Sequence, residues 1–187
     1  MFIQTEATPN PATLKFIPGK PVLPGGTRDF RKLEEAGDSP LATKLFGISG
    51  VSGVFLGHDF VTVSRNGVEW QQLKPAILGA IMDHYLSGAP VIAAGTEDDV
   101  SEADGESYDE AHKDIVKTIK DLLDSRVRPA VAQDGGDITF KAFKDGIVYL
   151  NMKGSCAGCP SSTATLKHGI ENLLRHFVPE VLEVKQV

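Results

Sequence analysis

The only two cysteines of this 187-residue chain provide its clearest chemical feature. Cys156 and Cys159 lie in the segment 154–160, which reads GSCAGCP. A tetrahedral zinc site or an iron–sulfur cluster normally takes four protein ligands, and one CxxC pair supplies two thiolates. Nothing else in the sequence is an obvious source of the other two. We therefore expect a metal site shared with the cysteines of a second copy, related by a two-fold axis.

The CxxC segment is predicted to join a strand, Ile147–Met152, to a helix that begins at Pro160 and runs to about Phe177. The unpaired N–H groups of the first helical turn carry partial positive charge. We expect them to lower the pKa of the thiols and to favour the thiolate that binds metal. Gly154 and Gly158 leave room for the backbone to approach a bulky cluster.

Three other uses of the cysteine pair have to be weighed. Thioredoxin-type exchange uses the same strand–CxxC–helix placement, but the 28 residues after Cys159 are too few for the rest of that fold. Zinc bridging two chains fits four thiolates as well as a cluster does. A purely structural thiol pair is the weakest alternative, because a glycine-rich turn that we expect to be exposed is a poor place for inert cysteines.

The histidines are weaker candidates for metal ligands. His168 and His176 lie on the predicted helix after the motif, and a cation at the position of His176 would interact favourably with the helix C-terminus. His168 would at most approach the surroundings of the site. His58 is predicted in a hairpin turn and His84 on a helix. We expect none of them to complete the site.

No catalytic motif stands out in the sequence. There is no Ser/His/Asp arrangement, no P-loop and no GxGxxG after a strand. Asp134 and Asp137 flank a Gly-Gly pair, and we expect them to make hydrogen bonds in a turn rather than to act as acid and base. The sequence therefore indicates a protein that is not an enzyme.

Composition excludes several other classes. Hydrophobic residues make up 41% and charged residues 24% of the chain, which is ordinary for a globular protein. No apolar run approaches the roughly 20 residues that cross a bilayer, so no membrane association is expected. The segment Met1–Glu6 resembles neither a secretory signal nor a transit peptide. We expect a bacterial cytoplasmic protein, or a mitochondrial matrix protein in its mature, imported form.

The net charge of −6 is concentrated in one segment. Residues 1–95 carry eight basic and eight acidic side chains, and residues 108–187 carry eleven of each. The six remaining acidic residues are Glu97, Asp98, Asp99, Glu102, Asp104 and Glu106. A segment of this composition cannot bury enough apolar surface to order itself, so 93–107 is predicted to be a flexible acidic linker. Two nearly neutral flanks make nucleic acid an unsuitable partner.

The linker separates two predicted α+β domains, 1–92 and 108–187. In the first, apolar patterns predict strands and helices at Ala12–Ile17, Pro40–Phe46, Val51–Leu56, Phe60–Ser64 and Trp70–Leu86, with Pro75 in the first turn or so of the last helix. In the second, they predict a helix, two strands, a helix and a strand at Asp109–Val127, Asp137–Phe143, Ile147–Met152, Pro160–Phe177 and Val181–Val187. Ile138, Phe140 and Ala142 are expected on one face of their strand.

Two pairs of segments carry a family resemblance. Residues 128–138, RPAVAQDGGDI, and 154–163, GSCAGCPSST, resemble the NifU C-terminal-type (Nfu) domain of iron–sulfur cluster carriers. Residues 8–16, TPNPATLKF, and the stretch Trp70–Pro75 resemble the Nfu N-terminal domain. The resemblance covers nearly the whole chain apart from the acidic linker.

This resemblance implies a cofactor and partners. It implies a [4Fe–4S] cluster bound by Cys156 and Cys159 of two protomers, which form a homodimer on cluster binding. It also implies that the cluster is passed to apo iron–sulfur proteins after supply by an upstream assembly scaffold. The N-terminal domain is expected to dock partners. A thiol–disulfide oxidoreductase and a zinc-bridged interaction module remain the alternatives.

Overall fold

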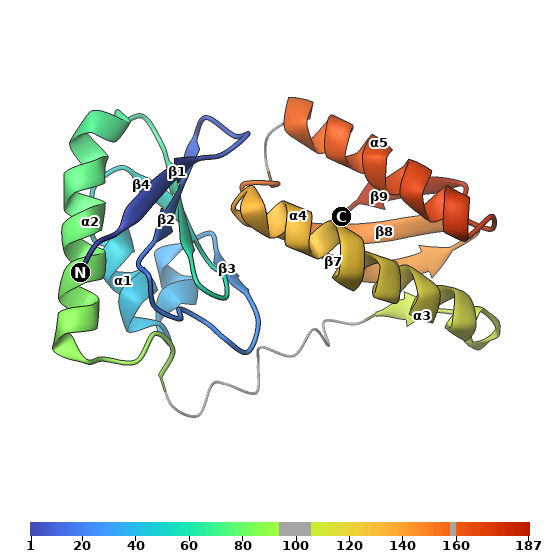
Figure 1. Cartoon of the computed structure of the whole chain (residues 1–187), viewed down its shortest axis with the longest axis horizontal. Coiled ribbons are helices and arrows are strands. Elements are labelled where there is room, and N and C mark those ends of the chain that lie inside the picture. The colour runs from blue at the N-terminus through green and yellow to red at the C-terminus, as the bar shows by residue number, and fades with distance from the viewer. Residues whose placement is uncertain (94–105, 158–159) are drawn as a thin grey trace. The chain divides into compact units, whose positions relative to one another are not determined.

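The chain folds as two compact units, Met1–Ser101 (unit 1) and Glu102–Val187 (unit 2), each built from helices packed on a sheet (Figure 1). The structure is a computed structural model that describes residues 1–93, 106–157 and 160–187. The prediction of two small α+β domains is confirmed. Most of the predicted linker, 93–107, lies outside the described residues.

Unit 1 contains a five-stranded antiparallel sheet in the order β1-β2-β5-β4-β3. Its strands are β1 (Gln4–Ala7), β2 (Thr13–Ile17), β3 (Arg28–Phe30), β4 (Val51–Leu56) and β5 (Val61–Arg65). The predicted hairpin is confirmed, since Leu56 pairs with Val61 across the turn between β4 and β5. The short edge strands β1 and β3 were not predicted, because each is mostly polar and has too few residues to show a period.

Three helical segments complete unit 1: η1 (Leu33–Ala36), α1 (Pro40–Phe46) and α2 (Trp70–Ser87). Ser39 caps α1, because its Oγ accepts a hydrogen bond from the N–H of Ala42 at 3.1 Å. Gly88 ends α2 in the left-handed conformation, with φ 71°. Pro75 lies in the second turn of α2, later than predicted. It removes the N–H that would reach the carbonyl of Gln71, whose exposed position leaves that carbonyl to water.

After α2 the chain folds back on α1. Ser39 Oγ donates to the carbonyl of Val91 at 2.7 Å, and the N–H of Ala93 donates to the carbonyl of Asp38 at 2.7 Å. Ile92 is buried between these contacts. The segment up to Ala93 is therefore held by unit 1, although the division at residue 92 stays a prediction.

Unit 2 contains a four-stranded mixed sheet in the order β6-β7-β8-β9. Its strands are β6 (Ser107–Tyr108), β7 (Gly136–Lys144), β8 (Ile147–Gly154) and β9 (Glu183–Gln186). β7 and β8 form an antiparallel hairpin, and the short edge strands run parallel to their neighbours. Asp145 and Gly146 both have positive φ, 53° and 76°, which fits a type I′ turn and confirms the predicted hairpin.

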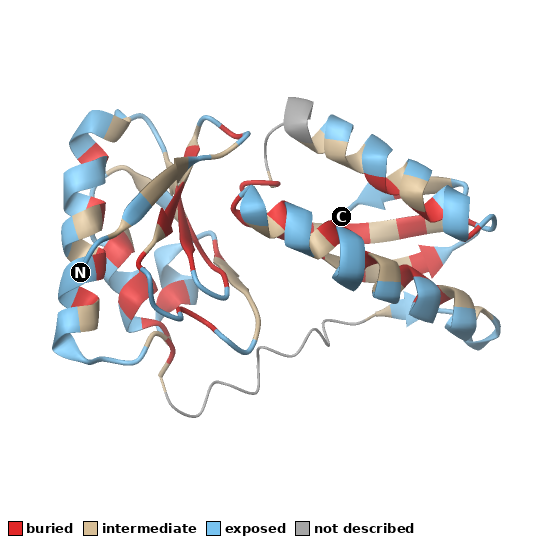
Figure 2. Cartoon of the chain, viewed as in Figure 1, coloured by how far each residue is buried: buried red, intermediate tan, exposed pale blue. Residues whose placement is uncertain are grey.

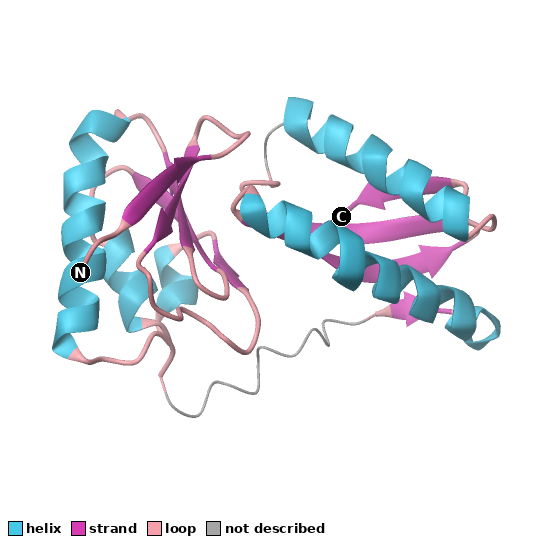
Figure 3. Ribbon diagram, in the orientation of Figure 1, coloured by secondary structure: helices cyan, strands magenta, loops and turns pink. Residues whose placement is uncertain are grey.

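The helices of unit 2 lie on one face of this sheet (Figure 3). They are η3 (Glu110–His112), α3 (Lys113–Leu122), the π-helical turn η4 (Leu123–Val127), α4 (Arg128–Gln133) and α5 (Pro160–Phe177). The first predicted helix thus continues beyond Val127 to Gln133. Pro129 cannot donate to the carbonyl of Ser125, and the wide π turn before it accommodates the lost hydrogen bond without ending the helix.

The core of unit 2 lies between the helices and the inner face of the sheet, as the buried positions in Figure 2 show. The prediction that Ile138, Phe140 and Ala142 share a face is wrong for Ala142. A β-bulge between Phe140 and Ala142 inserts one residue and reverses the alternation. As a result Phe143 is buried, at 3% exposure, and Ala142 is not. No helix in the described ranges is long and apolar enough to cross a membrane.

Candidate metal centre

The cysteine motif follows the predicted arrangement of strand, loop and helix. β8 ends at Gly154, whose φ of 66° turns the chain, and α5 begins at Pro160. Cys159 lies outside the described residues, so the structure places only the first of the two predicted ligands. Cys156 is 7% exposed and belongs to the hydrophobic core of unit 2. Our expectation of an exposed loop is therefore wrong at Cys156.

The sulfur of Cys156 packs against the first residue of β7. A Cβ atom placed on Gly136 would lie 2.7 Å from Cys156 Sγ and 2.7 Å from the carbonyl oxygen of Lys153. Gly136 is paired with Gly154 at the end of the β7–β8 hairpin. The absence of a side chain at Gly136 therefore makes the space that the thiol occupies.

Hydrogen bonds attach the loop to the turn before β7 and to α5. The Oγ of Ser155 donates to the carbonyl of Asp134, and the N–H of Ser155 donates to the carbonyl of Gly135 at 3.3 Å. On the other side, Thr163 Oγ1 of α5 donates to the carbonyl of Cys156 at 3.0 Å. Three hydrogen bonds thus hold the two residues that carry and precede the thiol.

Burial sets the protonation of this thiol. The pKa of Cys156 is raised to about 11, chiefly by loss of hydration and to a smaller extent by the nearby carboxylates of Asp134 and Asp137. A hydrogen bond with Ser155 acts in the opposite direction but is the weaker effect. The expected lowering of the pKa by the helix N-terminus is therefore wrong for Cys156, because desolvation dominates. The thiol form is favoured in this conformation.

Arg128 and Asp137 form an ion pair behind the turn, in which Asp137 is buried and Arg128 is partly exposed. Arg128 Nε donates to Asp137 Oδ1 and Nη2 to Oδ2, both at 2.9 Å, and Oδ1 also accepts from the N–H of Ile138 at 2.8 Å. Asp137 is only 3% exposed. We had expected Asp137 only to make hydrogen bonds in a turn. The structure shows that it also anchors α4 to β7. The sequence gives no local pattern from which this contact with Arg128 could be predicted.

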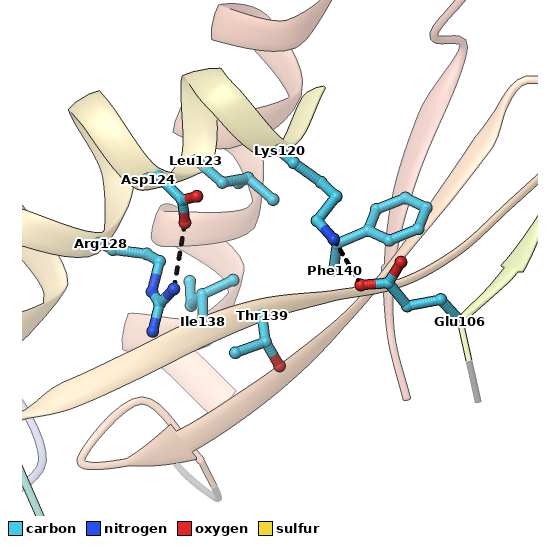
Figure 4. A pocket seen from close by; sticks show the side chains of 8 residues that line it. All are labelled: Glu106, Lys120, Leu123, Asp124, Arg128, Ile138, Thr139 and Phe140. Atoms are coloured by element: carbon cyan, nitrogen blue, oxygen red, sulfur yellow. Dashed lines mark hydrogen bonds and ion pairs between the residues drawn. The ribbon is translucent and has the colours of Figure 1, made fainter. Parts of the chain in front are cut away.

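A small pocket opens beside Arg128 (Figure 4). Its volume is about 10 Å³, roughly the space of one water molecule. Two ion pairs line it, Lys120 with Glu106 at 2.7 Å and Arg128 with Asp124 at 3.0 Å. Since these charges neutralise one another and the volume is small, this pocket is not a ligand site.

The histidines do not join the thiol. His58, His168 and His176 are exposed, and the ring of His176 packs edge-on against Phe177 at 4.9 Å. His84 is buried in unit 1, at 2% exposure. Within the described ranges, no three His, Cys, Asp or Glu side chains are grouped so that they could hold a metal ion. That part of one chain therefore contributes a single thiol.

Both halves of the chain match known families. The model described as "Scaffold protein Nfu/NifU N terminal" matches residues 3–88, and the model described as "NifU-like domain" matches residues 119–185. The human protein named "NFU1 iron-sulfur cluster scaffold homolog, mitochondrial" is 52% identical over 189 aligned positions. These cover all of this chain and 72% of the human protein.

Two further relatives extend this comparison. "NifU-like protein 4, mitochondrial" from Arabidopsis thaliana is 50% identical, over all of this chain and 66% of its own length. The solution structure of a NifU-like protein from Saccharomyces cerevisiae is 27% identical, covers 50% of this chain and 86% of its own, and has a TM-score of 0.46. The chain thus spans about two thirds to three quarters of the length of the human and Arabidopsis relatives.

The fold and the position of the thiol define a class of protein with two α+β units and a cysteine-bearing strand–helix loop. The two matched models and the identity to the human protein assign it more narrowly. This chain belongs to the Nfu family and joins an Nfu N-terminal domain to a NifU-like domain.

Proposed function

We propose that this protein is a scaffold and carrier that binds a [4Fe–4S] cluster through Cys156 and Cys159 of two copies and transfers it to apo-proteins. The observation that carries the proposal is the position of Cys156, in the short loop between the end of β8 at Gly154 and the start of α5 at Pro160. Support comes from the family, since the human relative is named an iron–sulfur cluster scaffold homolog.

The number of ligands supports a site shared between two copies. A [4Fe–4S] cluster takes four cysteine thiolates, and this chain contains two cysteines. Two copies related by a two-fold axis would supply four equivalent ligands from one CxxC pair each. Separation of the copies would halve the coordination, which suits a protein that releases its cargo.

Transfer would proceed by ligand exchange. Each bond from iron to Cys156 or Cys159 breaks as a bond to an acceptor thiolate forms, so one thiolate replaces another and no electron changes place. An upstream assembly scaffold would load the cluster by the same exchange in reverse. No covalent bond of a substrate is turned over, and the protein acts as a carrier rather than an enzyme.

Stoichiometry tests the shared site. We expect about four iron atoms per two chains after anaerobic reconstitution, with cluster loading driving dimerisation. Iron and sulfide analysis combined with size-exclusion chromatography of the loaded protein measures both. A monomer that retains a complete cluster would contradict the shared site.

The absorption spectrum of the reconstituted protein separates this function from the alternatives. A cluster gives broad visible absorption. A zinc-bridged module would be colourless, with each chain contributing two cysteine thiolates to the zinc ion. A disulfide oxidoreductase would likewise be colourless, and its activity would persist without metal.

Unit 1 lacks cysteine, and we propose that it docks partner proteins. A fragment for unit 2 should start before Glu106, because Glu106 pairs with Lys120 and Ser107 pairs with β7. We expect such a fragment to bind the cluster but to transfer it more slowly to some acceptors. Since the named relatives are mitochondrial, we propose the mitochondrial matrix as its location. Imaging of the tagged full-length protein tests this.

A further inference from the structure

We propose that the turn Asp134–Gly136 and Ser155 position the sulfur of Cys156 for cluster binding, with Gly136 as the seat of the sulfur and Ser155 as the tether of the loop. The inference rests on the proposed function, because it concerns how this chain presents one of its ligands. Asp134, Gly135, Gly136 and Ser155 are called the clasp below. None of them is a ligand itself.

Glycine is needed at position 136 because of the space that its missing side chain leaves, and not because of its backbone angles. Gly135 needs glycine because its φ is 81°, but Gly136 is not among the residues with positive φ. A methyl group at Gly136 would meet two neighbours at 2.7 Å, closer than real Cβ contacts come. One of them, the carbonyl of Lys153, is part of the hairpin backbone and cannot yield easily. An alanine at this position would therefore displace the sulfur of Cys156 and also shift the hairpin backbone at Lys153.

Ser155 fixes the backbone that carries the thiol. Its side chain is 2% exposed, and its Oγ and N–H reach two successive carbonyls of the clasp, those of Asp134 and Gly135. Thr163 of α5 also donates to the carbonyl of Cys156, so Ser155 and Cys156 are held from two sides. Loss of the Ser155 hydroxyl would remove the side-chain bond to the turn before β7.

The ion pair of Asp137 with Arg128 supports the clasp from behind. Asp137 directly follows Gly136, and its carboxylate is bound by the guanidinium of Arg128 through two bonds of 2.9 Å. This contact fixes the start of β7 relative to α4, so the seat at Gly136 is held in place. A continuous set of contacts therefore runs from α4 through the turn to the sulfur.

Accurate placement matters because a shared cluster needs sulfurs from two copies at once. Residues that orient a metal ligand without touching the metal typically change metal affinity about 10- to 100-fold when they are replaced. Each defect in the clasp would occur twice in a two-fold symmetric site. We therefore expect the clasp to affect cluster retention more than its distance from iron suggests.

Two glycine-to-alanine changes in the full-length protein test the seat. Gly136→Ala should lower cluster retention against a competing iron chelator about 10-fold or more. Gly169→Ala in α5 is the matched control, because an added Cβ there meets nothing within 4 Å. Retention by the Gly169→Ala variant should equal that of the wild type. Thermal unfolding of each cluster-free variant shows whether a loss follows from instability alone.

Two serine-to-alanine changes test the tether. Ser155→Ala removes the hydroxyl that donates to Asp134, and we expect reduced retention of the cluster. Ser125→Ala is its control, because Ser125 Oγ also donates to a backbone carbonyl of unit 2, that of Asp121, at 2.6 Å. The control should keep wild-type retention.

A readout without iron follows the sulfur directly. In a Cys159→Ser background, Cys156 is the only thiol, and its alkylation rate reports its accessibility. Gly136→Ala should expel the sulfur and raise this rate at least about five-fold at a temperature well below unfolding, whereas Gly169→Ala should not. This measurement does not require a cluster to bind.

The outcomes separate this inference from the proposed function. If Gly136→Ala matches Gly169→Ala in cluster retention and alkylation, the seat at Gly136 is wrong, and if Ser155→Ala matches Ser125→Ala in cluster retention, the tether at Ser155 is wrong. It is also wrong if Ser155→Ala takes up more cluster than the wild type, because the tether would then restrain the thiol. If the wild type binds no cluster while alkylation changes as expected, Gly136 still seats the sulfur and the proposed function fails.

Discussion

Each unit contains a two-stranded hairpin followed by a long helix, β4–β5–α2 in unit 1 and β7–β8–α5 in unit 2. In unit 1, the side chain of Arg65 at the end of β5 bonds to two residues of the β5–α2 connection. Arg65 donates to the carbonyl of Val68 at 2.8 Å and pairs with Glu69 at 3.3 Å. In unit 2 the equivalent connection carries Cys156. The same arrangement of elements therefore carries a loop bridged by side-chain contacts in one unit and the loop that we propose to bind the cluster in the other.

The units also differ in what they do with a buried group that could bind metal. Burial keeps both groups neutral: it lowers the pKa of His84 in unit 1, helped by the charge of Lys44, and raises the pKa of Cys156 in unit 2. His84 lies within the regular helix α2, packed edge-on against Tyr85 at 5.4 Å. Cys156 lies in the loop that leads into α5, and its sulfur fills the space left by Gly136. The two buried groups therefore differ in backbone setting, a regular helix for His84 and a loop for Cys156.

The largest difference between the units should appear when the thiols are removed. Cys156→Ser or Cys159→Ser should abolish stable cluster binding, because each variant leaves two copies with two thiolates. Iron analysis after reconstitution measures this, and wild-type iron content in either variant would show that the replaced cysteine is not a ligand. Cys156→Ser should also lower the melting temperature of unit 2, since the thiol is buried in its core.

A second difference concerns ion pairs. Arg128→Ala should destabilise unit 2 by about 3 kcal/mol, because it leaves the carboxylate of Asp137 buried without its partner. Arg31→Ala in unit 1 should cost less than about 1 kcal/mol, since Arg31 is 62% exposed in its pair with Asp29. Chemical denaturation of the full-length variants measures both. Equal effects would mean that the Arg128 pair has no special structural role.

The smallest effect is a pH dependence confined to unit 1. Because the pKa of His84 in the folded protein lies below its ordinary value of 6.5, the unfolded chain binds a proton that the folded unit excludes. Stability is therefore full above about pH 6.5 and falls as the pH decreases, by at most about 1.4 kcal/mol per pH unit. Unfolding curves between pH 7.5 and about 5 should show this for the wild type. His84→Gln should flatten the dependence, and an unchanged slope would exclude His84 as its source.

The elements that the sequence predicted are those with a strong local signal. α1 and α5 have the predicted bounds, and the β4–β5 and β7–β8 hairpins follow from apolar strands around turn residues. The missed strand β6 has two residues, too few to show a period, and is defined by its parallel pairing with β7. The bulge at Phe140–Ala142 was also missed, because an inserted residue shows itself only when two strands are paired.

The candidate site also has features that the sequence predicted and features that it did not. The motif indicated Cys156 and Cys159 as ligands and a strand–helix loop as their setting, because cysteine spacing and turn residues are adjacent in the chain. The seat at Gly136 and the bonds of Ser155 to the preceding turn were not predicted. They join residues about 20 positions apart in the sequence, which meet only because β7 pairs with β8.

The sequence by itself determined the two-unit α+β organisation, the hairpins, the long helices and the pair of cysteines, because each depends on residue types within a few positions of one another. The tertiary structure decided that Cys156 is buried, that its pKa is raised and that Asp137 pairs with Arg128. Hydration, close packing and ion pairing depend on which segments, distant in the sequence, pack around the same volume. That volume exists only once helices and sheet enclose it.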